Sequence, residues 1–343
     1  MTVKTALIGY GYAGRVIHAP LIRAAEGLEL AAIVSSRPED VHADIPTVKV
    51  TDFDAVLEDA SIDAVVIATP NDLHAPQAHA ALEAGKHVVI DKPFALNVPE
   101  AEDLIRHAKR NDRLLSVFHS RRWDSNNLTL SALRPRLGTL YQVGLRYDRW
   151  RPTVRDRWRE RKGPGSGIWF DLGSHLVDQS LSQFGWPDWI SADIAGQRPG
   201  AQTDDYFHVV LGYGPLRVIL HSSMMTSQPG ACIEAQGTTG SFVKYGIDPQ
   251  EDQLKALIVP GSDGWGADPV AATFTPTDGD TVGAIEQVTA TPGNYLGYYE
   301  QLARAIADGG ENPVPAEDAL KVMRILALGF ESAMKGHRLP CRM

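Results

Sequence analysis

Three side chains in this sequence, Lys92, Asp171 and His175, are of the types that hold or move protons during catalysis. A histidine, whose unperturbed pKa is about 6.5, can act as acid or base near neutral pH, and a lysine can stabilise negative charge developing on an oxygen. Lys92 directly follows the apolar run His87–Ile90 and Asp91. Asp171 and His175 lie four residues apart, which predicts that they share a helix face or its entry turn.

A glycine-rich loop supplies the second signal. Gly9-Tyr10-Gly11-Tyr12-Ala13-Gly14 follows a predicted strand, Thr5–Ile8, and opens a predicted helix, Gly14–Glu26. In that context the first glycine permits a tight turn, the second lets the backbone approach a pyrophosphate, and the third allows close helix–sheet packing. The helix N-terminus would add N–H donors and a positive dipole. We therefore predict a dinucleotide site with the contacts Gly9, Gly11, Tyr12, Ala13 and Gly14.

The residues after the second predicted strand, Leu28–Val34, indicate which dinucleotide binds. A site that prefers NAD usually places a carboxylate here to hold the ribose 2′-hydroxyl. This chain instead has Ser35-Ser36-Arg37 and no acid before Glu39. Arginine can pair bidentately with a 2′-phosphate, and serine can donate hydrogen bonds to it. We predict NADP as the preferred cofactor, through Ser35, Ser36 and Arg37, with NAD as the alternative if Arg37 is only a solvated surface residue.

Two types of pattern divide the chain. Residues 1–120 alternate short apolar runs with helical patterns, which is typical of βαβ units and a parallel sheet. Beyond Arg121, strands follow one another through turns such as Tyr213-Gly214-Pro215, which indicates a mostly antiparallel sheet. The predicted strands there are Leu140–Tyr147, Ala192–Ala195, Tyr206–Leu211, Leu216–His221, Ile233–Gly237 and Ser241–Lys244.

The predicted fold is therefore α/β, with an N-terminal Rossmann domain and a C-terminal α+β domain. The Rossmann domain, a doubly wound parallel sheet, is expected at residues 1–120. The second domain, at 121–343, would carry a large, open-faced, mostly antiparallel sheet for substrate binding and oligomerisation, and its terminal helix could pack back on the first domain. Residues 247–293, rich in Gly, Asp, Pro and Thr, are predicted to be long loops.

Composition excludes several classes of protein. A chain of 343 residues suits two domains, and a net charge of -9 gives no electrostatic reason to bind nucleic acid or an anionic membrane. The two cysteines, Cys232 and Cys341, suggest neither a disulfide framework nor a metal site. The N-terminus lacks the layout of a signal peptide, and no apolar run approaches the roughly 20 residues that span a bilayer. The expected location is the cytoplasm.

These segments together resemble the glucose–fructose oxidoreductase / inositol dehydrogenase (Gfo/Idh/MocA) family. The resemblance covers essentially the whole chain and rests on the order and spacing of the Gly-rich loop, Thr69-Pro70-Asn71 with His74, Ala84-Gly85-Lys86-His87-Val88, Lys92-Pro93, and Asp171 with His175. One departure is Asp91, where the family usually has glutamate, so the partner of this shorter carboxylate must sit slightly nearer.

Further segments look like the branch that contains NADP-dependent scyllo-inositol dehydrogenases. They are Arg121-Arg122-Trp123-Asp124, Asp148-Arg149-Trp150-Arg151-Pro152, Arg157-Trp158-Arg159-Glu160, Asp171-Leu172-Gly173-Ser174-His175-Leu176-Val177-Asp178-Gln179 and Asp204-Asp205-Tyr206-Phe207. The resemblance implies hydride transfer between a nicotinamide dinucleotide and a polyol, an inositol or a sugar, with scyllo-inositol as the best single substrate. It also implies a homodimer or homotetramer that pairs through the open face of the second sheet.

Specific roles follow from the resemblance. His175 would act as base or acid, Asp171 would orient its imidazole and hold a substrate hydroxyl, and Lys92 would hydrogen-bond the reacting oxygen. The implied cofactor contacts are Thr69, Pro70, Asn71, His74, Asp91, Lys92, Trp158 and Arg159. The implied substrate contacts are Lys92, Arg122, Arg149, Asp171 and His175. For His74, helix capping or core packing explains the residue about as well.

Two other functions remain open. The family includes non-catalytic dinucleotide-sensing regulators, although such a sensor has no chemical need for Lys92, Asp171 and His175 together. Other relatives hydrolyse glycosides or eliminate groups after transient oxidation of the sugar ring, so that their cofactor is regenerated. Net accumulation of reduced cofactor would separate a dehydrogenase from that class.

Overall fold

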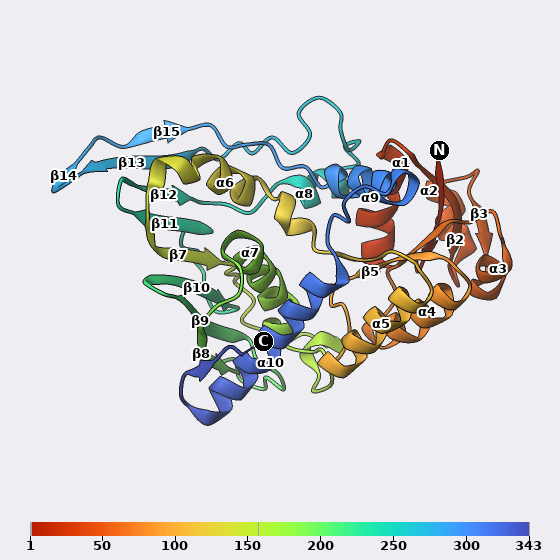
Figure 1. Ribbon diagram of the computed structural model, residues 1–343, viewed down its shortest axis with the longest axis horizontal. Coiled ribbons are helices and arrows are strands. Elements are labelled where there is room, and N and C mark those ends of the chain that lie inside the picture. The colour runs from red at the N-terminus through yellow and green to blue at the C-terminus, as the bar shows by residue number, and fades with distance from the viewer. Residues whose placement is uncertain (1, 157, 343) are drawn as a thin grey trace. The chain divides into compact units, whose positions relative to one another are not determined.

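The computed structural model describes residues 2–156 and 158–342, which form two compact units (Figure 1). Unit 1 comprises Met1–Trp123, Gln250–Trp265 and Asn294–Leu320. Unit 2 comprises Asp124–Pro249, Gly266–Gly293 and Lys321–Met343. This division differs from the predicted one, because two later segments that sequence assigned to the second domain pack in unit 1.

Unit 1 is built on a parallel sheet with the strand order β3-β2-β1-β4-β5-β6. The strands are β1 (Val3–Ile8), β2 (Leu28–Val34), β3 (Lys49–Thr51), β4 (Ala64–Ile67), β5 (His87–Asp91) and β6 (Leu115–Phe118). The order reverses between β1 and β4, and ligands bind at the carboxyl ends of strands beside such a switch point. Every residue of β4 and β6 is buried; β4 is apolar throughout, as expected of a buried parallel strand, whereas β6 includes the polar Ser116.

Helices cover this sheet. One group packs against β1 and β2 and contains α1 (Ala19–Ala24) and α9 (Leu296–Asp308), which contact each other. A second group contains α4 (Asn71–Glu83), which packs on β4, β5 and α5 (Val98–Arg110). The remaining helical segments of the unit are η1 (Ala13–His18), α2 (Pro38–Asp44), α3 (Phe53–Glu58), η2 (Ser120–Trp123) and α8 (Gln250–Lys255). Because α9 covers part of the Rossmann sheet, a segment far along the sequence completes the core of unit 1.

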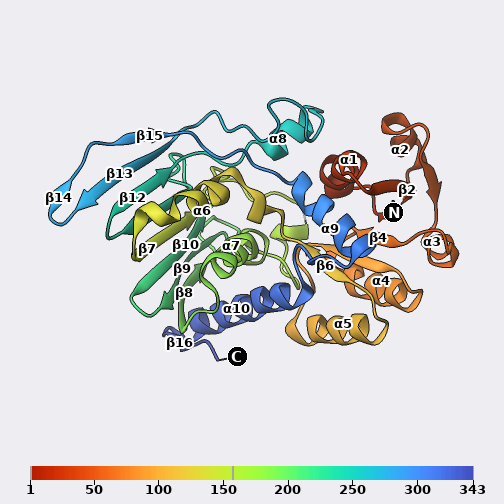
Figure 2. The same ribbon diagram turned by 45° about the horizontal axis from the view of Figure 1, so that its top comes forward.

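Unit 2 contains a mixed, mostly antiparallel sheet in the order β14-β13-β12-β11-β7-β10-β9-β8-β16, with β15 beside β13 (Figure 2). The strands are β7 (Leu140–Arg146), β8 (Trp189–Ala195), β9 (Tyr206–Tyr213), β10 (Leu216–Ser223), β11 (Ile233–Gly237), β12 (Gly240–Lys244), β13 (Ala272–Asp278), β14 (Thr281–Val282), β15 (Glu286–Val288) and β16 (Leu339–Pro340). Among these pairings, β10 with β7 is parallel.

One face of this second sheet is buried and the other is half-buried. In β9 and β10 the buried positions alternate with half-buried ones, so Phe207, Val209 and Leu211 face the core while Val210 and Ile219 do not. The helical segments of unit 2 are α6 (Ser125–Leu137), which packs on β11 and β12, η3 (Trp158–Glu160), η4 (Trp169–Gly173), α7 (Ser174–Phe184) on β10, and α10 (Ala316–Lys335), which begins before the unit boundary.

The observed architecture confirms the predicted fold class, but one prediction inside it was wrong. Residues 247–293 are not long loops throughout, because they contain α8, β13, β14 and β15. Strand β13 pairs with β12, placing Phe274 opposite Phe242 with both side chains buried. Pro276 near its end and the flanking polar residues hid the alternation from the sequence reading. In the described part of the chain, none of the helices is long and apolar enough to cross a membrane.

Candidate dinucleotide and substrate sites

The three glycines of the Gly-rich loop differ in the space around them. At Gly9, whose φ is +99°, a Cβ would lie 2.9 Å from the Ala68 carbonyl oxygen, and at Gly14 a Cβ would lie 2.1 Å from the Gly9 carbonyl oxygen. These two positions need glycine because backbone packs against backbone. At Gly11 a Cβ would meet nothing within 4 Å, so the loop keeps an open space beside its backbone. The approach of a pyrophosphate to the backbone at this opening stays a prediction.

The helix that begins at the loop opens with a turn of π-helix. Ala13–His18 forms this turn and runs directly into α1, whereas the sequence predicted one regular helix. Its first backbone N–H groups belong to residues beside the open space at Gly11, where they can serve anion oxygens. Single π turns recur at functional sites, and no feature of the local sequence announces this one.

The residues after β2 form a small polar turn. The Arg37 amide donates to Ser35 Oγ at 3.1 Å, and the Arg37 guanidinium lies 3.2 Å from Asp40 Oδ2 on α2. Because the Arg37 side chain is 60% exposed, its pairing with Asp40 is a weak surface contact that a 2′-phosphate could replace. The donors predicted for NADP therefore lie together at the carboxyl end of β2.

The loop after β4 carries the predicted residues Thr69, Pro70, Asn71 and His74. Thr69 donates through Oγ1 to Gln77 at 2.7 Å, and Asn71 is the first residue of α4. His74 is 1% exposed, and its two ring nitrogens face the carbonyl oxygens of Thr69 and Pro93 at 2.9 and 3.0 Å. Both nitrogens are thus engaged by backbone, which favours the structural role that sequence left open for His74.

Asp91 ends β5 immediately before Lys92, and its partner is His18. The His18 Nε2 lies 3.6 Å from Asp91 Oδ1, an ion-pair distance, and its Nδ1 is hydrogen-bonded to the Tyr299 hydroxyl. Burial raises the pKa of the Tyr299 phenol well above its ordinary value. Burial alone would raise the pKa of Asp91, but His18 and neighbouring cationic side chains hold it below its ordinary value.

The predicted acid–base pair lies in unit 2 at the start of α7. Asp171 stands in a π turn, Trp169–Gly173, that runs directly into the helix, and His175 is the second residue of α7 with 8% exposure. Gly173 lets the turn close, because a Cβ there would lie 2.4 Å from the Trp169 ring. The two residues therefore occupy the helix entry, as predicted, although the wider π turn changes their angular offset.

Asp171 also lines a pocket of unit 2. Its lining residues are Arg149, Arg151, Arg159, Glu160, Gly167, Ile168, Asp171, Arg198, Thr203, Asp204 and Met224. The Asp171 carboxylate lies 3.9 Å from the Arg159 guanidinium. The lining combines arginine donors with carboxylate acceptors, and both can hydrogen-bond to hydroxyl groups.

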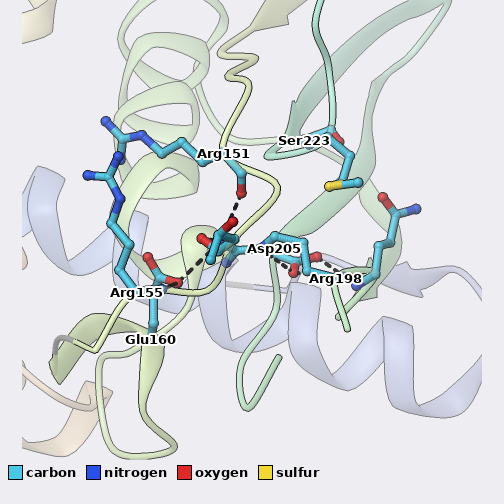
Figure 3. A network of polar contacts seen from close by, with 9 residues as sticks. Arg151, Arg155, Glu160, Arg198, Asp205 and Ser223 are labelled. Carbon is cyan, nitrogen blue, oxygen red and sulfur yellow. Dashed lines mark hydrogen bonds and ion pairs between the residues drawn. The ribbon is translucent and has the colours of Figure 1, made fainter. Parts of the chain in front are cut away.

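A buried arginine, Arg198, holds one side of this pocket in place (Figure 3). Its guanidinium pairs with Asp205 at 2.8 Å and with Glu160 at 3.2 Å, and it donates to the Arg151 carbonyl oxygen at 3.1 Å. Glu160 in turn accepts a hydrogen bond from the Arg155 amide. Sequence reasoning missed Arg198, because nothing in its neighbourhood marks it as the centre of a buried charge network.

Asp204 is held beside Gly167 in the same pocket. A Cβ at Gly167 would lie 1.9 Å from Asp204 Oδ1, so only glycine leaves room for this carboxylate. Asp204 Oδ2 accepts from the Trp169 amide at 2.6 Å. Burial is the main cause that raises the pKa of Asp204 to about 6, although its backbone hydrogen bonds oppose the shift.

We expect Asp204→Asn to flatten the pH dependence of stability between about pH 4 and pH 6. The folded state binds the Asp204 proton more tightly than the unfolded chain does, so its stabilising contribution is complete below about pH 4 and is lost as pH rises through 6. That loss is at most about 3 kcal/mol. Urea unfolding of both proteins across this range measures it, and parallel curves would contradict the prediction. The asparagine keeps an acceptor for the Trp169 amide.

The two predicted substrate contacts Arg122 and Arg149 lie in different units. Arg122 belongs to unit 1, where its guanidinium lies 3.4 Å from Asp318. Arg149 lies in unit 2, where it lines the same pocket as Asp171, and its guanidinium stands 5.5 Å from the centre of the Tyr147 ring. Arg157 and the side chain of Trp158 lie outside the described residues, so the predicted cofactor contact of Trp158 stays a prediction. Within the described ranges, no cluster of three His, Cys, Asp or Glu side chains is arranged to hold a metal ion.

Comparisons with known proteins bear on the resemblance. Residues 3–119 match the Gfo/Idh/MocA oxidoreductase family, NAD-binding Rossmann fold, and residues 133–341 match its C-terminal alpha/beta domain. The chain is 48% identical over 335 residues to the uncharacterized oxidoreductase YdgJ of Escherichia coli, covering 96% of each. It is 39% identical over 343 residues to the scyllo-inositol 2-dehydrogenase (NADP(+)) IolW of Bacillus subtilis, covering 97% of this chain and 94% of that protein.

A solved structure agrees with these matches. The Bacillus subtilis protein yvaA, assigned as an oxidoreductase, shares 37% identity and a TM-score of 0.96 with this chain, with 99% of both chains covered. The family matches span both units and the relatives are aligned over almost their whole length, which confirms the predicted resemblance. This chain is thus an oxidoreductase that belongs to the Gfo/Idh/MocA family and carries its NAD-binding Rossmann fold.

Proposed function

We propose that this protein is an NADP-dependent dehydrogenase or reductase that acts on a polyol, an inositol or a sugar, with scyllo-inositol as the first substrate to test. The observation that carries the proposal is the pocket of unit 2, where the Asp171 carboxylate lies 3.9 Å from the Arg159 guanidinium and the lining combines arginine donors with carboxylate acceptors. A relative at 39% identity is named a scyllo-inositol 2-dehydrogenase, which supports the choice of substrate.

The proposed chemistry assigns each proton to a side chain. When bound, the nicotinamide supplies the hydride donor or acceptor. His175 takes the proton of the substrate hydroxyl on a ring nitrogen, and Asp171 orients that imidazole and accepts from a substrate hydroxyl. Lys92 donates a hydrogen bond to the reacting oxygen and stabilises the negative charge that develops there. The resemblance to the family assigns Lys92, of unit 1, and the acid–base pair, of unit 2, to one reaction.

The direct test mixes purified protein with NADP⁺ and a panel of inositols and sugars, or NADPH and their keto forms, and follows the absorbance of the reduced cofactor. Turnover of cofactor with any member supports a dehydrogenase. Product formed without net accumulation of reduced cofactor would instead indicate the redox-assisted hydrolase or lyase. Tight dinucleotide binding with no turnover in either direction would favour the non-catalytic sensor.

Arg37→Ala should reduce the preference for NADP over NAD by about tenfold or more. The guanidinium can pair bidentately with the 2′-phosphate, and such a pair contributes roughly 1.5–3 kcal/mol. NAD lacks this phosphate, so its affinity should change little. Titration of protein fluorescence with each cofactor measures both affinities, and Arg23→Ala, on α1 in the same unit, is the control. An unchanged ratio would assign Arg37 to the solvated surface.

Assembly and location complete the proposal. The half-buried face of the second sheet carries Val210 and Ile219 among polar residues, which suits pairing of two copies into a homodimer or homotetramer. Measurement of the mass in solution by light scattering tests it, and a monomer at working concentrations would remove it. The proposed location is the cytoplasm, and the proposed partners are small molecules rather than nucleic acid or membrane.

A further inference from the structure

A short helix outside the Rossmann sequence lies against the Gly-rich loop. Helix α8 (Gln250–Lys255) belongs to unit 1 and contacts η1, although more than 230 residues separate the two in sequence. The Tyr12 hydroxyl donates to Glu251 Oε1 at 2.7 Å. Tyr12 stands immediately after Gly11, at the open space beside the loop backbone. The contact therefore ties the predicted pyrophosphate loop to a distant segment of the chain.

Two cationic side chains surround the Glu251 carboxylate. Its carboxylate lies 3.2 Å from Lys255 Nζ and 3.7 Å from the Arg121 guanidinium, whose side chain is 9% exposed. The Tyr12 hydrogen bond and these cationic neighbours outweigh the effect of burial and hold the pKa of Glu251 below its ordinary value. A carboxylate beside an anion site would repel the ligand unless cations offset its charge, and here two of them do.

Helix α8 is itself anchored at its first residue. Gln250 is fully buried, accepts a hydrogen bond from the Tyr295 amide at 2.6 Å and donates to the Trp123 carbonyl oxygen at 3.2 Å. Both partners belong to unit 1. Glu251 thus follows a buried, hydrogen-bonded residue at the start of α8. Tyr12, in contrast, is 56% exposed and lies on a loop with open space beside it.

We propose that Glu251 is a positioning residue for the dinucleotide: through its hydrogen bond to the Tyr12 hydroxyl it fixes the Gly-rich loop in the conformation that receives the pyrophosphate. The inference rests on dinucleotide binding by unit 1, which is part of the proposed function. A loop fixed before binding loses less conformational entropy when the ligand arrives, so the hydrogen bond between Tyr12 and Glu251 raises affinity although Glu251 itself does not touch the ligand.

For Glu251→Gln, the loss of charge and the loss of positioning predict opposite changes in dinucleotide affinity. Glu251→Gln removes a negative charge near an anion site, which by itself would tighten binding. It also replaces the charge-assisted hydrogen bond to Tyr12 with a weaker one, which by itself would weaken binding. Tyr12→Phe removes the same hydrogen bond and leaves the charge in place. If the hydrogen bond between Tyr12 and Glu251 positions the loop, Glu251→Gln and Tyr12→Phe both weaken dinucleotide binding.

The experiment measures the dissociation constant of NADPH by its fluorescence, for the full-length protein and for Tyr12→Phe, Glu251→Gln and the double variant. We expect each single variant to bind about fivefold more weakly, the effect of one exposed charge-assisted hydrogen bond. The double variant should also bind about fivefold more weakly rather than about 25-fold, because both changes remove one interaction. Unfolding midpoints should stay unchanged.

Asp252→Asn is the matched control. Asp252 is the next residue of the helix, pairs with Lys255 at 2.9 Å and is 84% exposed, so its variant should bind NADPH within twofold of the wild type. Tighter binding by Glu251→Gln, unchanged binding by Tyr12→Phe, or independent effects in the double variant would each overturn the proposal. If the wild type bound neither NADPH nor NADH, the proposed function itself would fail.

Discussion

Replacing Lys92 with methionine should lower kcat for the oxidation or reduction by about a thousandfold. The lysine follows β5 at the carboxyl edge of the Rossmann sheet, and in the proposed reaction its ammonium group donates to the oxygen that gains negative charge. Methionine keeps most of the length and apolar volume of the side chain but cannot donate. NADPH affinity should stay within a few-fold of the wild type, so the loss should fall on turnover. Steady-state kinetics together with NADPH titration separate the two effects.

Lys86→Met provides the matched control for this prediction. Lys86 lies in the same unit, is 4% exposed and donates through Nζ to the carbonyl oxygens of Asp59 and Ile62 at 2.6 and 2.9 Å. Its loss should destabilise unit 1 by about 1–3 kcal/mol while kcat of the folded protein stays within threefold. If Lys92→Met retained a tenth or more of the wild-type kcat, Lys92 would have no direct part in the chemistry.

Two alanine substitutions in the Gly-rich loop should have opposite consequences. Gly14→Ala places a Cβ 2.1 Å from the Gly9 carbonyl oxygen, so backbone must shift, and we expect a loss of about 3 kcal/mol in the free energy of unfolding. Gly11→Ala meets nothing within 4 Å and should leave that free energy within about 1 kcal/mol of the wild type. It fills the space proposed for the pyrophosphate, however, so NADPH should bind about 50-fold more weakly.

Urea unfolding and NADPH titration of both variants check these expectations. Gly163→Ala is a control, because a Cβ there also meets nothing within 4 Å and the residue lies in unit 2. A Gly11→Ala variant that keeps both wild-type stability and wild-type NADPH affinity would show that the open space at Gly11 is not the pyrophosphate position. A stable Gly14→Ala variant would show that the loop can relax at little cost.

Most strands and helices of this protein could be predicted because their patterns are local. Leu28–Val34 and Ile233–Gly237 were predicted with the bounds that the structure shows. The errors lie where local signals are weak. Strand β3 is only three residues long, and β13 ends in a polar segment with a proline, so only pairing with neighbouring strands stabilises them.

In the candidate site, too, local motifs could be predicted from the sequence and contacts between distant segments could not. The partner of Asp91 could not be predicted, because His18 lies on a different element and meets it only through the packing of α1 and α9 on the sheet. The same reason hid the contacts of Arg198 with Glu160 and with the Arg151 carbonyl oxygen, and the contact of Glu251 with Tyr12, because each joins segments distant in sequence. Sequence did mark Asp204 and Asp205 as parts of a motif, but the close packing of Asp204 on Gly167 needed the structure.

The sequence by itself determined the family, the Rossmann fold and the types of side chain available for hydride-transfer chemistry, because motif spacing and apolar periodicity are properties of neighbouring residues. Only the tertiary structure decided which glycine of the loop is open, which histidine faces Asp91, and which distant helix holds the loop. These features depend on contacts between segments far apart in the chain, and each is fixed by the packing of backbone and side chains in the folded units.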